Sequence, residues 1–232
     1  MSEELVRYEL RGTVAVLQMD DGKVNAFSPA MIESLSARFE RARSEARAVA
    51  LFGRPGKFSA GFDLRIMMSG PSAARDLVTQ GAGVLLTLYE YPHPVVVGCT
   101  GHAMAAGLLL TATADRRIGA RGPFKLGLNE IQAGMPVPIF AHELARDRLD
   151  PRALIEATIH ATVYDPEGAL RVGWLDELVE PDALESRVMA EAERLAKLSG
   201  KNYAMSKASL RRQTIEHVRA TLAANMKEFG VG

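Results

Sequence analysis

The chain has 232 residues, of which 47% are hydrophobic and 24% are charged, a balance typical of a folded protein and too apolar for a disordered one. Its 28 basic residues equal its 28 acidic residues, which argues against nucleic acid or an anionic membrane as a partner. The single cysteine, Cys99, excludes an intrachain disulfide and a zinc site built on several thiolates, and it fits the reducing cytoplasm. We expect no metal site. We also expect no membrane-spanning segment, because the longest weakly polar run, Ala103 to Ala114, is too short to cross a bilayer.

The first half of the chain alternates predicted strands with predicted helices. A β-branched strand over residues 14–19 ends at an Asp-Asp-Gly turn. Ser28-Pro29 then supplies an N-cap and a first-turn proline, and apolar residues recur at helical spacing up to Ala42. A second strand covers residues 48–52 and ends at a Gly-Arg-Pro-Gly turn.

The pattern repeats in the middle of the chain. After a short loop, a helix is expected to begin near Phe62 or Asp63, and residues 94–99 form a buried strand. The segment Ala103–Thr113 is small and apolar on all sides, which predicts a buried central helix. Residues 116–119 are expected to form one more short strand.

The second half is predicted to be mainly helical, because prolines recur where helices would begin. The predicted helices cover residues 139–148, 152–161, 167–172, 182–199 and about 205–228. Strands that alternate with helices, followed by helices alone, indicate an α/β fold with a helical C-terminal region.

Two segments place a glycine-containing turn between a strand and a helix, residues 57–64 and residues 101–107. The first N–H groups of a helix have no partner in the helix and can bind an anion. Two such groups that converge form an oxyanion hole, in which each donor lowers a barrier by roughly 3 kcal/mol. The alternative is that both turns serve packing alone.

These segments resemble the crotonase superfamily, which comprises the enoyl-CoA hydratases and isomerases. The resemblance extends over nearly the whole chain in four ordered motifs, Lys23–Phe27, Phe58–Leu64, Pro92–Gly107 and Asp165–Val179. It implies a crotonase-like spiral of repeated ββα units over residues 1–195 and a helical C-terminal trimerisation region over residues 196–232, together one structural unit. It also implies an acyl-CoA thioester as ligand, with coenzyme A as part of the substrate and no separate cofactor, and assembly into a homotrimer or a dimer of trimers.

The resemblance assigns the oxyanion hole to the backbone N–H groups of Phe62 and Ala106. The sequence departs from the common pattern at both places. Ala105-Ala106 stand where two glycines are usual, and Phe62 stands where alanine is usual. Backbone donors remain available after these changes, but we expect the phenyl ring to narrow the acyl tunnel.

The residues for proton transfer point to isomerase chemistry. The positions of the two hydratase glutamates fall at Leu109 and near Leu128, neither of which carries a proton. The sequence around Glu130 instead resembles that of the monofunctional mitochondrial-type Δ3,Δ2-enoyl-CoA isomerases, whose single catalytic glutamate matches Glu130. In an apolar tunnel, desolvation would raise its pKa and suit it to both removing and returning a proton. The alternative is an ordinary solvated carboxylate.

Further residues are expected at the substrate. The segment after Glu130 supplies apolar candidates for the tunnel wall, Ile131, Met135, Val137, Ile139 and Phe140. The basic residues between Lys197 and Lys227 are interpreted as a solvated helix face, although the resemblance also allows basic residues there and near the first loop to meet the CoA phosphates. Asp63 is expected to cap the helix that follows it. The candidate substrate and CoA contacts are Lys23, Val24, Ala26, Lys57, Ala60, Asp63, Leu64, Leu109 and Lys227.

The leading hypothesis is therefore an enzyme that converts 3-enoyl-CoA to 2-enoyl-CoA through a thioester dienolate. A hydratase with an unusual acid pair and another enolate-forming enzyme are the catalytic alternatives. A non-catalytic acyl-CoA-binding protein is the alternative from a different class, since Leu109 already removes one catalytic acid.

Overall fold

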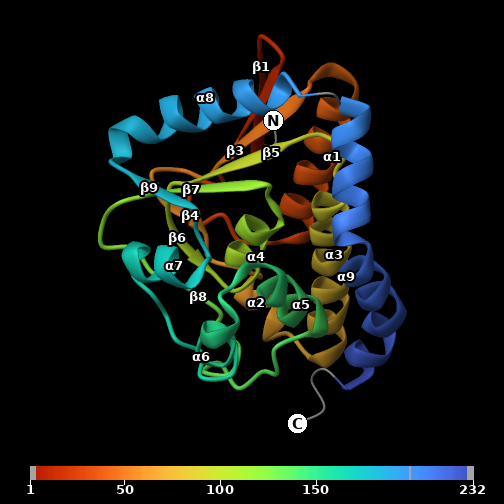
Figure 1. Ribbon diagram of the computed structural model, residues 1–232. Helices are drawn as coiled ribbons and strands as arrows, with labels where there is room; N and C mark the ends of the chain where they lie inside the picture. Colours follow the sequence, from red (N-terminus) through yellow and green to blue (C-terminus); the bar gives the residue numbers. More distant parts are fainter. Residues whose placement is uncertain (1–3, 199, 229–232) are drawn as a thin grey trace.

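The computed structural model describes residues 4–198 and 200–228, and its centre is a mainly parallel sheet (Figure 1). The six strands lie in the order β1-β2-β3-β5-β7-β9, and only β1 and β2 are antiparallel neighbours. Their bounds are β1 Val6–Arg11, β2 Val14–Met19, β3 Ala48–Phe52, β5 Val95–Cys99, β7 Arg116–Ala120 and β9 Glu177–Val179.

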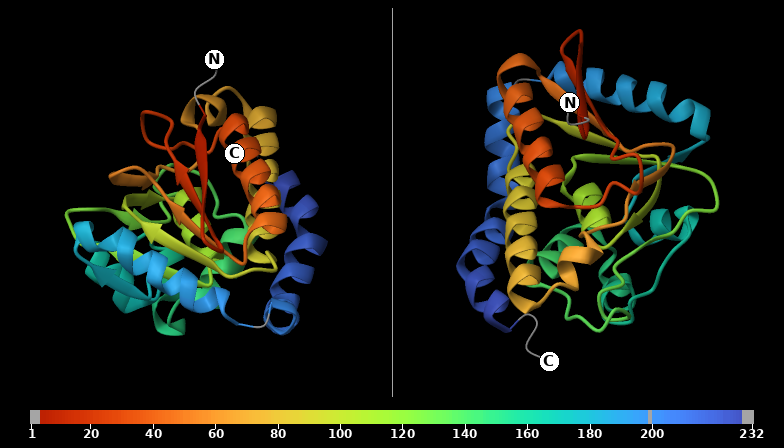
Figure 2. Two further views of the ribbon diagram at one scale, coloured as in Figure 1. Left: turned by 90° about the horizontal axis from the view of Figure 1, so that it is seen from above. Right: turned by 180° about the vertical axis from the view of Figure 1, so that it is seen from behind.

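Both faces of this sheet are covered, as continuous apolar strands require. Successive side chains of a strand point to opposite faces, so Ala48 and Ala50 of β3 pack with helix α8 (Leu184–Ala196), whereas Val49 and Leu51 join the main core. That core includes helices α1 (Pro29–Glu45) and α3 (Pro71–Tyr89). Figure 2 shows α8 on one side of the sheet, with α1 and α3 on the other.

A second, smaller sheet carries the segments that the sequence marks for chemistry. It consists of the parallel strands β4 (Gly56–Ser59), β6 (Gly101–Met104) and β8 (Leu126–Gly127). Helix α4 (Ala106–Thr113) follows β6 and is buried along its whole length, which confirms the predicted central helix. The prediction was wrong about its start, because Ala103 and Met104 pair with β8 and hold the backbone extended there.

The remaining helices agree largely with the proline pattern. Ser28 and Asp63 accept hydrogen bonds from the N–H groups of Met31 and Arg65, as their predicted capping roles require. The last helix begins at Gly200 rather than Met205. Some predicted residues lie outside the described ones, namely residues 199 and 229–232 of the C-terminal region and residues 1–3 of the core. The bounds are α2 Leu64–Met67, α5 Ile139–Arg148, α6 Leu154–Thr158, α7 Pro166–Val172 and α9 Gly200–Glu228, with short 3-10 turns at Pro151–Ala153 and Pro181–Ala183.

Within the described part of the chain, no helix combines the length and the apolar composition needed to cross a bilayer.

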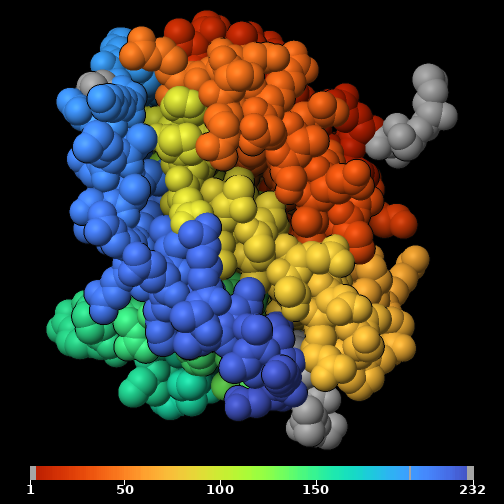
Figure 3. Space-filling model, turned by 90° about the vertical axis from the view of Figure 1, so that its right-hand side faces the viewer, coloured from red at the N-terminus to blue at the C-terminus, as the bar shows by residue number. Residues whose placement is uncertain are grey.

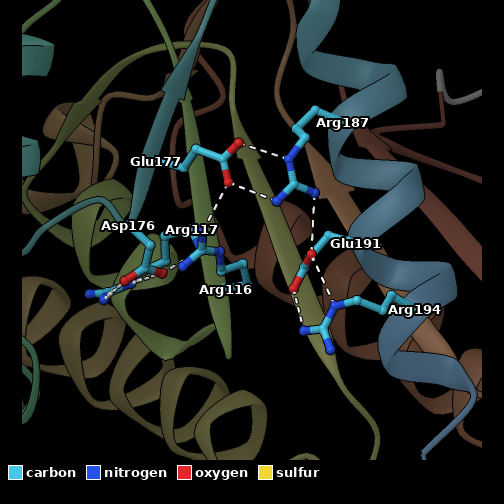
Figure 4. Close-up of polar contacts among 7 residues, drawn as sticks. All are labelled: Arg116, Arg117, Asp176, Glu177, Arg187, Glu191 and Arg194. Atoms are coloured by element: carbon cyan, nitrogen blue, oxygen red, sulfur yellow. Dashed lines mark hydrogen bonds and ion pairs between the residues drawn. The ribbon is translucent and has the colours of Figure 1, made fainter.

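Helix α8 is also fixed to the edge of the sheet by ion pairs (Figure 4). Arg187 donates to both oxygens of Glu177 at 2.7 and 2.8 Å, and Arg116 reaches the same carboxylate at 2.9 Å. Glu191 accepts from Arg187 and from Arg194. This series of ion pairs connects β7, β9 and α8.

Helix α9 lies along the outside of α3, as Figure 3 shows in blue and yellow. Its basic residues are not simply a solvated face, and the interpretation was wrong for Lys207 and Arg211. Both are buried, and they donate to the two oxygens of Asp115 at 2.7 and 2.8 Å. At its other end, the Asn225 side chain accepts a hydrogen bond from the Ile139 N–H of α5 at 2.9 Å. Helix α9 is therefore attached to the rest of the chain in both its first and its second half.

This arrangement predicts a large effect for Asp115→Ala. The substitution leaves two buried cations without their carboxylate, so the free energy of unfolding is expected to fall by about 3–5 kcal/mol in urea denaturation. Glu40→Ala is the matched control, because Glu40 pairs with Arg43 at the surface with 74% of its side chain exposed. That change is expected to cost less than about 1 kcal/mol, and similar losses for the two variants would contradict the prediction.

Candidate active site

The first glycine-containing turn presents an unpaired backbone N–H at Phe62. Gly61 and Asp63 face Phe27, since the Phe27 N–H donates to Gly61 O and the Asp63 N–H donates to Phe27 O. In an extended segment the N–H of the intervening residue points to the opposite side. The Phe62 N–H therefore points away from Phe27.

The second turn lies directly against the first. A Cβ atom placed on Gly61 would lie 2.9 Å from the Met104 carbonyl oxygen and 3.3 Å from the Ala106 nitrogen. Only glycine permits so close an approach, and its φ of +87° also favours glycine. The turn before α4 is thereby held beside the Phe62 amide.

The Ala106 N–H is the first of helix α4 and has no acceptor within the helix. Within residues 4–198 and 200–228, neither this N–H nor that of Phe62 donates to a protein acceptor. Two unpaired donors on adjoining turns, one of them at a helix N-terminus, form an arrangement that can hold an oxyanion.

Ala105, between β6 and α4, has an unusual backbone conformation, with φ of 48° and ψ of −125°. This region is favourable only for glycine. The Ala105 N–H donates to Gly127 O at 2.9 Å, and its carbonyl accepts from Leu108 and Leu109. The strain is held in place by these hydrogen bonds, at the point where the chain redirects the Ala106 N–H.

A cavity of about 480 Å³ opens beside this turn. The loop after β2 contributes the charged residues Asp21 and Lys23 to its wall, whereas α2 and α3 contribute apolar side chains together with Arg65. The lining residues are Asp21, Lys23, Val24, Ala26, Ser28, Ala60, Phe62, Asp63, Leu64, Arg65, Met67, Val78, Ala105, Asn129, Glu130, Ala133, Met135 and Pro138.

Glu130 is the carboxylate of this cavity that lies farthest from water. Its residue is only 8% exposed, and its Oε2 atom is buried without a hydrogen-bond partner. Burial raises the pKa of Glu130 to about 7, since no neighbouring cation offsets the loss of water. The alternative of an ordinary solvated carboxylate is therefore wrong, and a group able to accept and donate a proton near neutral pH lies in the cavity wall.

No second proton-carrying side chain occupies the hydratase positions. Leu109 on α4 and Leu128 after β8 are both buried in the main core. No group of three or more His, Cys, Asp or Glu side chains that could hold a metal ion is found among residues 4–198 and 200–228.

Comparisons with known proteins identify the family of the chain. Residues 9–231 match the family described as enoyl-CoA hydratase/isomerase. The chain belongs to the enoyl-CoA hydratase/isomerase family. Its structure is similar to that of an enoyl-CoA isomerase from Mycobacterium tuberculosis, with a TM-score of 0.92, 35% identity and coverage of 97% of this chain and 99% of the other.

Other relatives in the family have different names. An enoyl-CoA hydratase from Mycobacterium marinum is 33% identical, with a TM-score of 0.91 and coverage of 97% of this chain and 100% of the other. The human mitochondrial enoyl-CoA delta isomerase 1 is 27% identical over 230 residues, which are 97% of this chain and 76% of the human protein. The family is thus established, and relatives in it are named after two different reactions.

The structure brings most of the candidate site residues together around the cavity of this family member. Lys23, Val24, Ala26, Ala60, Phe62, Asp63, Leu64 and Glu130 line it, as does Met135 from the expected tunnel wall. Ala106 is buried and is not itself a lining residue, although its neighbour Ala105 lines the cavity.

Other candidates lie outside the cavity wall. Lys57 is exposed on β4, Lys227 is exposed in the last turn of α9, and Leu109 is in the core. Ile131, Val137, Ile139 and Phe140 are likewise not among the lining residues.

The residues that fix the first turn were not predicted from the sequence. The Asn25 side chain is fully buried and donates to the carbonyl oxygens of Met19 and Phe58. Ser59 donates its hydroxyl to Asn25 O at 2.7 Å and accepts from the Gly61 N–H at 3.3 Å. The position of Asn25 between the apolar residues Val24 and Ala26 was the available signal.

The strain at Ala105 predicts that Ala105→Gly stabilises the protein. Relief of the conformation is worth about 1–3 kcal/mol, and the greater freedom of glycine in the unfolded chain returns about 1 kcal/mol of this. Urea denaturation should therefore show a net gain of about 1 kcal/mol. Ala112→Gly, in the regular part of α4, is the control and should lose about 1 kcal/mol or more. Destabilisation by both changes would contradict the interpretation of Ala105.

The raised pKa of Glu130 predicts a pH-dependent effect of Glu130→Gln on stability. Between the ordinary value of 4.5 and about 7, the folded protein keeps a proton that the unfolded chain has lost, so this group reduces stability as the pH rises. Glutamine does not titrate, so the variant does not lose stability in this way as the pH rises. The free energy of unfolding of the variant relative to wild type should thus increase by about 3 kcal/mol between pH 4 and pH 8. Urea denaturation measures it, and a difference between the two proteins that stays constant with pH would disprove the raised pKa of Glu130.

Proposed function

We propose that this family member is a Δ3,Δ2-enoyl-CoA isomerase, which converts 3-enoyl-CoA to 2-enoyl-CoA. The observation that carries the proposal is the buried, unpaired carboxylate of Glu130, in a cavity beside two unpaired backbone N–H groups. Double-bond migration needs one group that removes and returns a proton, and the cavity supplies one such group in a suitable environment.

In the proposed reaction, ionised Glu130 removes a proton from C2 of the 3-enoyl thioester. The electron pair of the broken C–H bond moves into a dienolate, whose thioester oxygen is held by the N–H groups of Phe62 and Ala106. The protonated Glu130 then returns the proton to C4, and the double bond lies between C2 and C3. A pKa near 7 lets one side chain perform both transfers.

Hydration is the second candidate function, because the Mycobacterium marinum relative is named an enoyl-CoA hydratase. Addition of water to a 2-enoyl thioester calls for two positioned groups, one for the water and one for the α-proton. Leucine at positions 109 and 128 argues against this pair. A non-catalytic acyl-CoA binder would have no need for a desolvated, unpaired carboxylate, which carries a cost in stability.

The substrate would enter with its CoA phosphates toward the basic residues of the cavity wall, Lys23 and Arg65. The family resemblance further leads us to propose a homotrimer or a dimer of trimers in the cytoplasm. Light scattering at micromolar concentration tests the assembly, and a monodisperse monomer would rule it out.

The function is tested by incubating the protein with 3-enoyl-CoA and, separately, with 2-enoyl-CoA. An isomerase forms 2-enoyl-CoA from the first substrate and little 3-hydroxyacyl-CoA from the second. Predominant hydration of 2-enoyl-CoA would favour the hydratase instead, and binding without turnover of either substrate would favour the binder.

Glu130→Gln is expected to lower isomerase turnover by roughly 100-fold or more, because the amide cannot accept the C2 proton. The affinity for a saturated acyl-CoA should change little, since both backbone N–H groups remain. In the wild type, kcat/KM should fall about tenfold per pH unit below pH 7, as Glu130 becomes protonated. Unchanged turnover in the variant would show that another group carries the proton.

A further inference from the structure

Phe62 contributes to the cavity in two ways, through its backbone N–H and through its ring. The ring points toward α3, at Gly81. A Cβ atom placed on Gly81 would lie 2.3 Å from Cε1 and 2.6 Å from Cζ of Phe62. The end of the ring therefore occupies a notch at Gly81, which is the space that any other residue at position 81 would fill with its side chain.

The ring is braced on a second side by Phe27. The two rings make an edge-to-face contact, with centroids 6.1 Å apart and an interplanar angle of 89°. Phe27 is fully buried, whereas Phe62 is half-buried and borders the cavity. Val78, one helical turn before Gly81, borders the same cavity. The Phe62 ring is thus a fixed part of the wall between the first loop and α3.

A thioester oxygen bound at the Phe62 N–H places the start of the acyl chain next to this ring. The wall nearby is apolar and includes Val78, Met67 and Met135, as an aliphatic chain requires. We propose that the Phe62 ring, seated in the notch at Gly81, limits the length of the acyl chain that the cavity accepts. This proposal rests on the acyl-CoA function proposed above.

The proposal has a measurable consequence for binding. Each methylene that enters the cavity should tighten binding by about fourfold, and methylenes that the ring excludes should add little. Dissociation constants for saturated acyl-CoAs, from butanoyl-CoA to hexadecanoyl-CoA, should therefore fall with chain length up to a break and then level off. Isothermal titration calorimetry measures this break without any turnover.

Two substitutions should move the break in opposite directions. Phe62→Ala keeps the backbone N–H but removes the ring, so the break should move to longer chains by two carbons or more. Gly81→Ala adds a methyl group where the ring end lies and pushes the ring toward the cavity, so the break should move to shorter chains. Because the added methyl acts through the ring, Gly81→Ala should have no such effect when combined with Phe62→Ala.

Met68→Ala is the matched control, because Met68 follows α2, is 84% exposed and does not line the cavity. It should leave the break unchanged. Phe62→Leu, a smaller change to the packing, should lengthen the accepted chain less than Phe62→Ala and serves if the alanine variant does not fold.

The two proposals fail in different ways. If wild type and variants bind acyl-CoAs with the same break, the Phe62 ring does not limit the chain and only this inference is overturned. If Gly81→Ala shortens the accepted chain in the absence of the ring, the notch acts by another route and the inference is again overturned. If the wild type binds no acyl-CoA of any length, the proposed function itself is wrong.

Discussion

The close approach of two chain turns is the constraint on which the site depends. Gly61 lies so near the Ala105-Ala106 turn that a single side-chain carbon would meet backbone atoms. This contact joins segments that are more than forty residues apart and brings two unpaired N–H groups to one cavity. Because both donors belong to the backbone, their positions depend on how the turns pack rather than on the side chains at those positions. The structure holds one turn with the buried amide of Asn25 and the other with the backbone hydrogen bonds of the strained Ala105.

Helix α4 shows how the fold satisfies one end of a helix and leaves the other end free. At its C-terminal end, Arg148 donates to the carbonyl oxygens of Ala112 and Ala114 at 2.7 and 2.8 Å. Positive charge at this end complements the helix dipole. At its N-terminal end no protein acceptor meets the Ala106 N–H within the described chain. The same short helix is therefore well anchored in the core and still able to bind a negatively charged oxygen.

Local patterns predicted those parts of the molecule whose causes are local. Ser28-Pro29 marked the start of α1, and the glycine-containing turns marked the two segments that hold the unpaired N–H groups of Phe62 and Ala106. The short strands β4, β6 and β8 have two to four residues each, too few for an alternating pattern, so their pairing depends on the surrounding fold. Helix α3 was missed because glycines at positions 81 and 83 weaken its intrinsic propensity, although Leu77, Val78 and Leu85 bury its apolar face. Burial of Lys207 could not be predicted either, since its partner Asp115 lies 92 residues away.

The attachment of α9 to Asp115 has a consequence for the order in which the chain folds. Asp115 is synthesised long before Lys207 and Arg211, and its final position is 10% exposed, between those two cations. Until helix α9 has been synthesised, Asp115 has neither of these counter-charges, and enclosing its carboxylate in the core without them would cost several kcal/mol. The nascent chain therefore gains little from closing this part of the core early. Synthesis of helix α9 supplies the two charges that allow the Asp115 carboxylate to be buried.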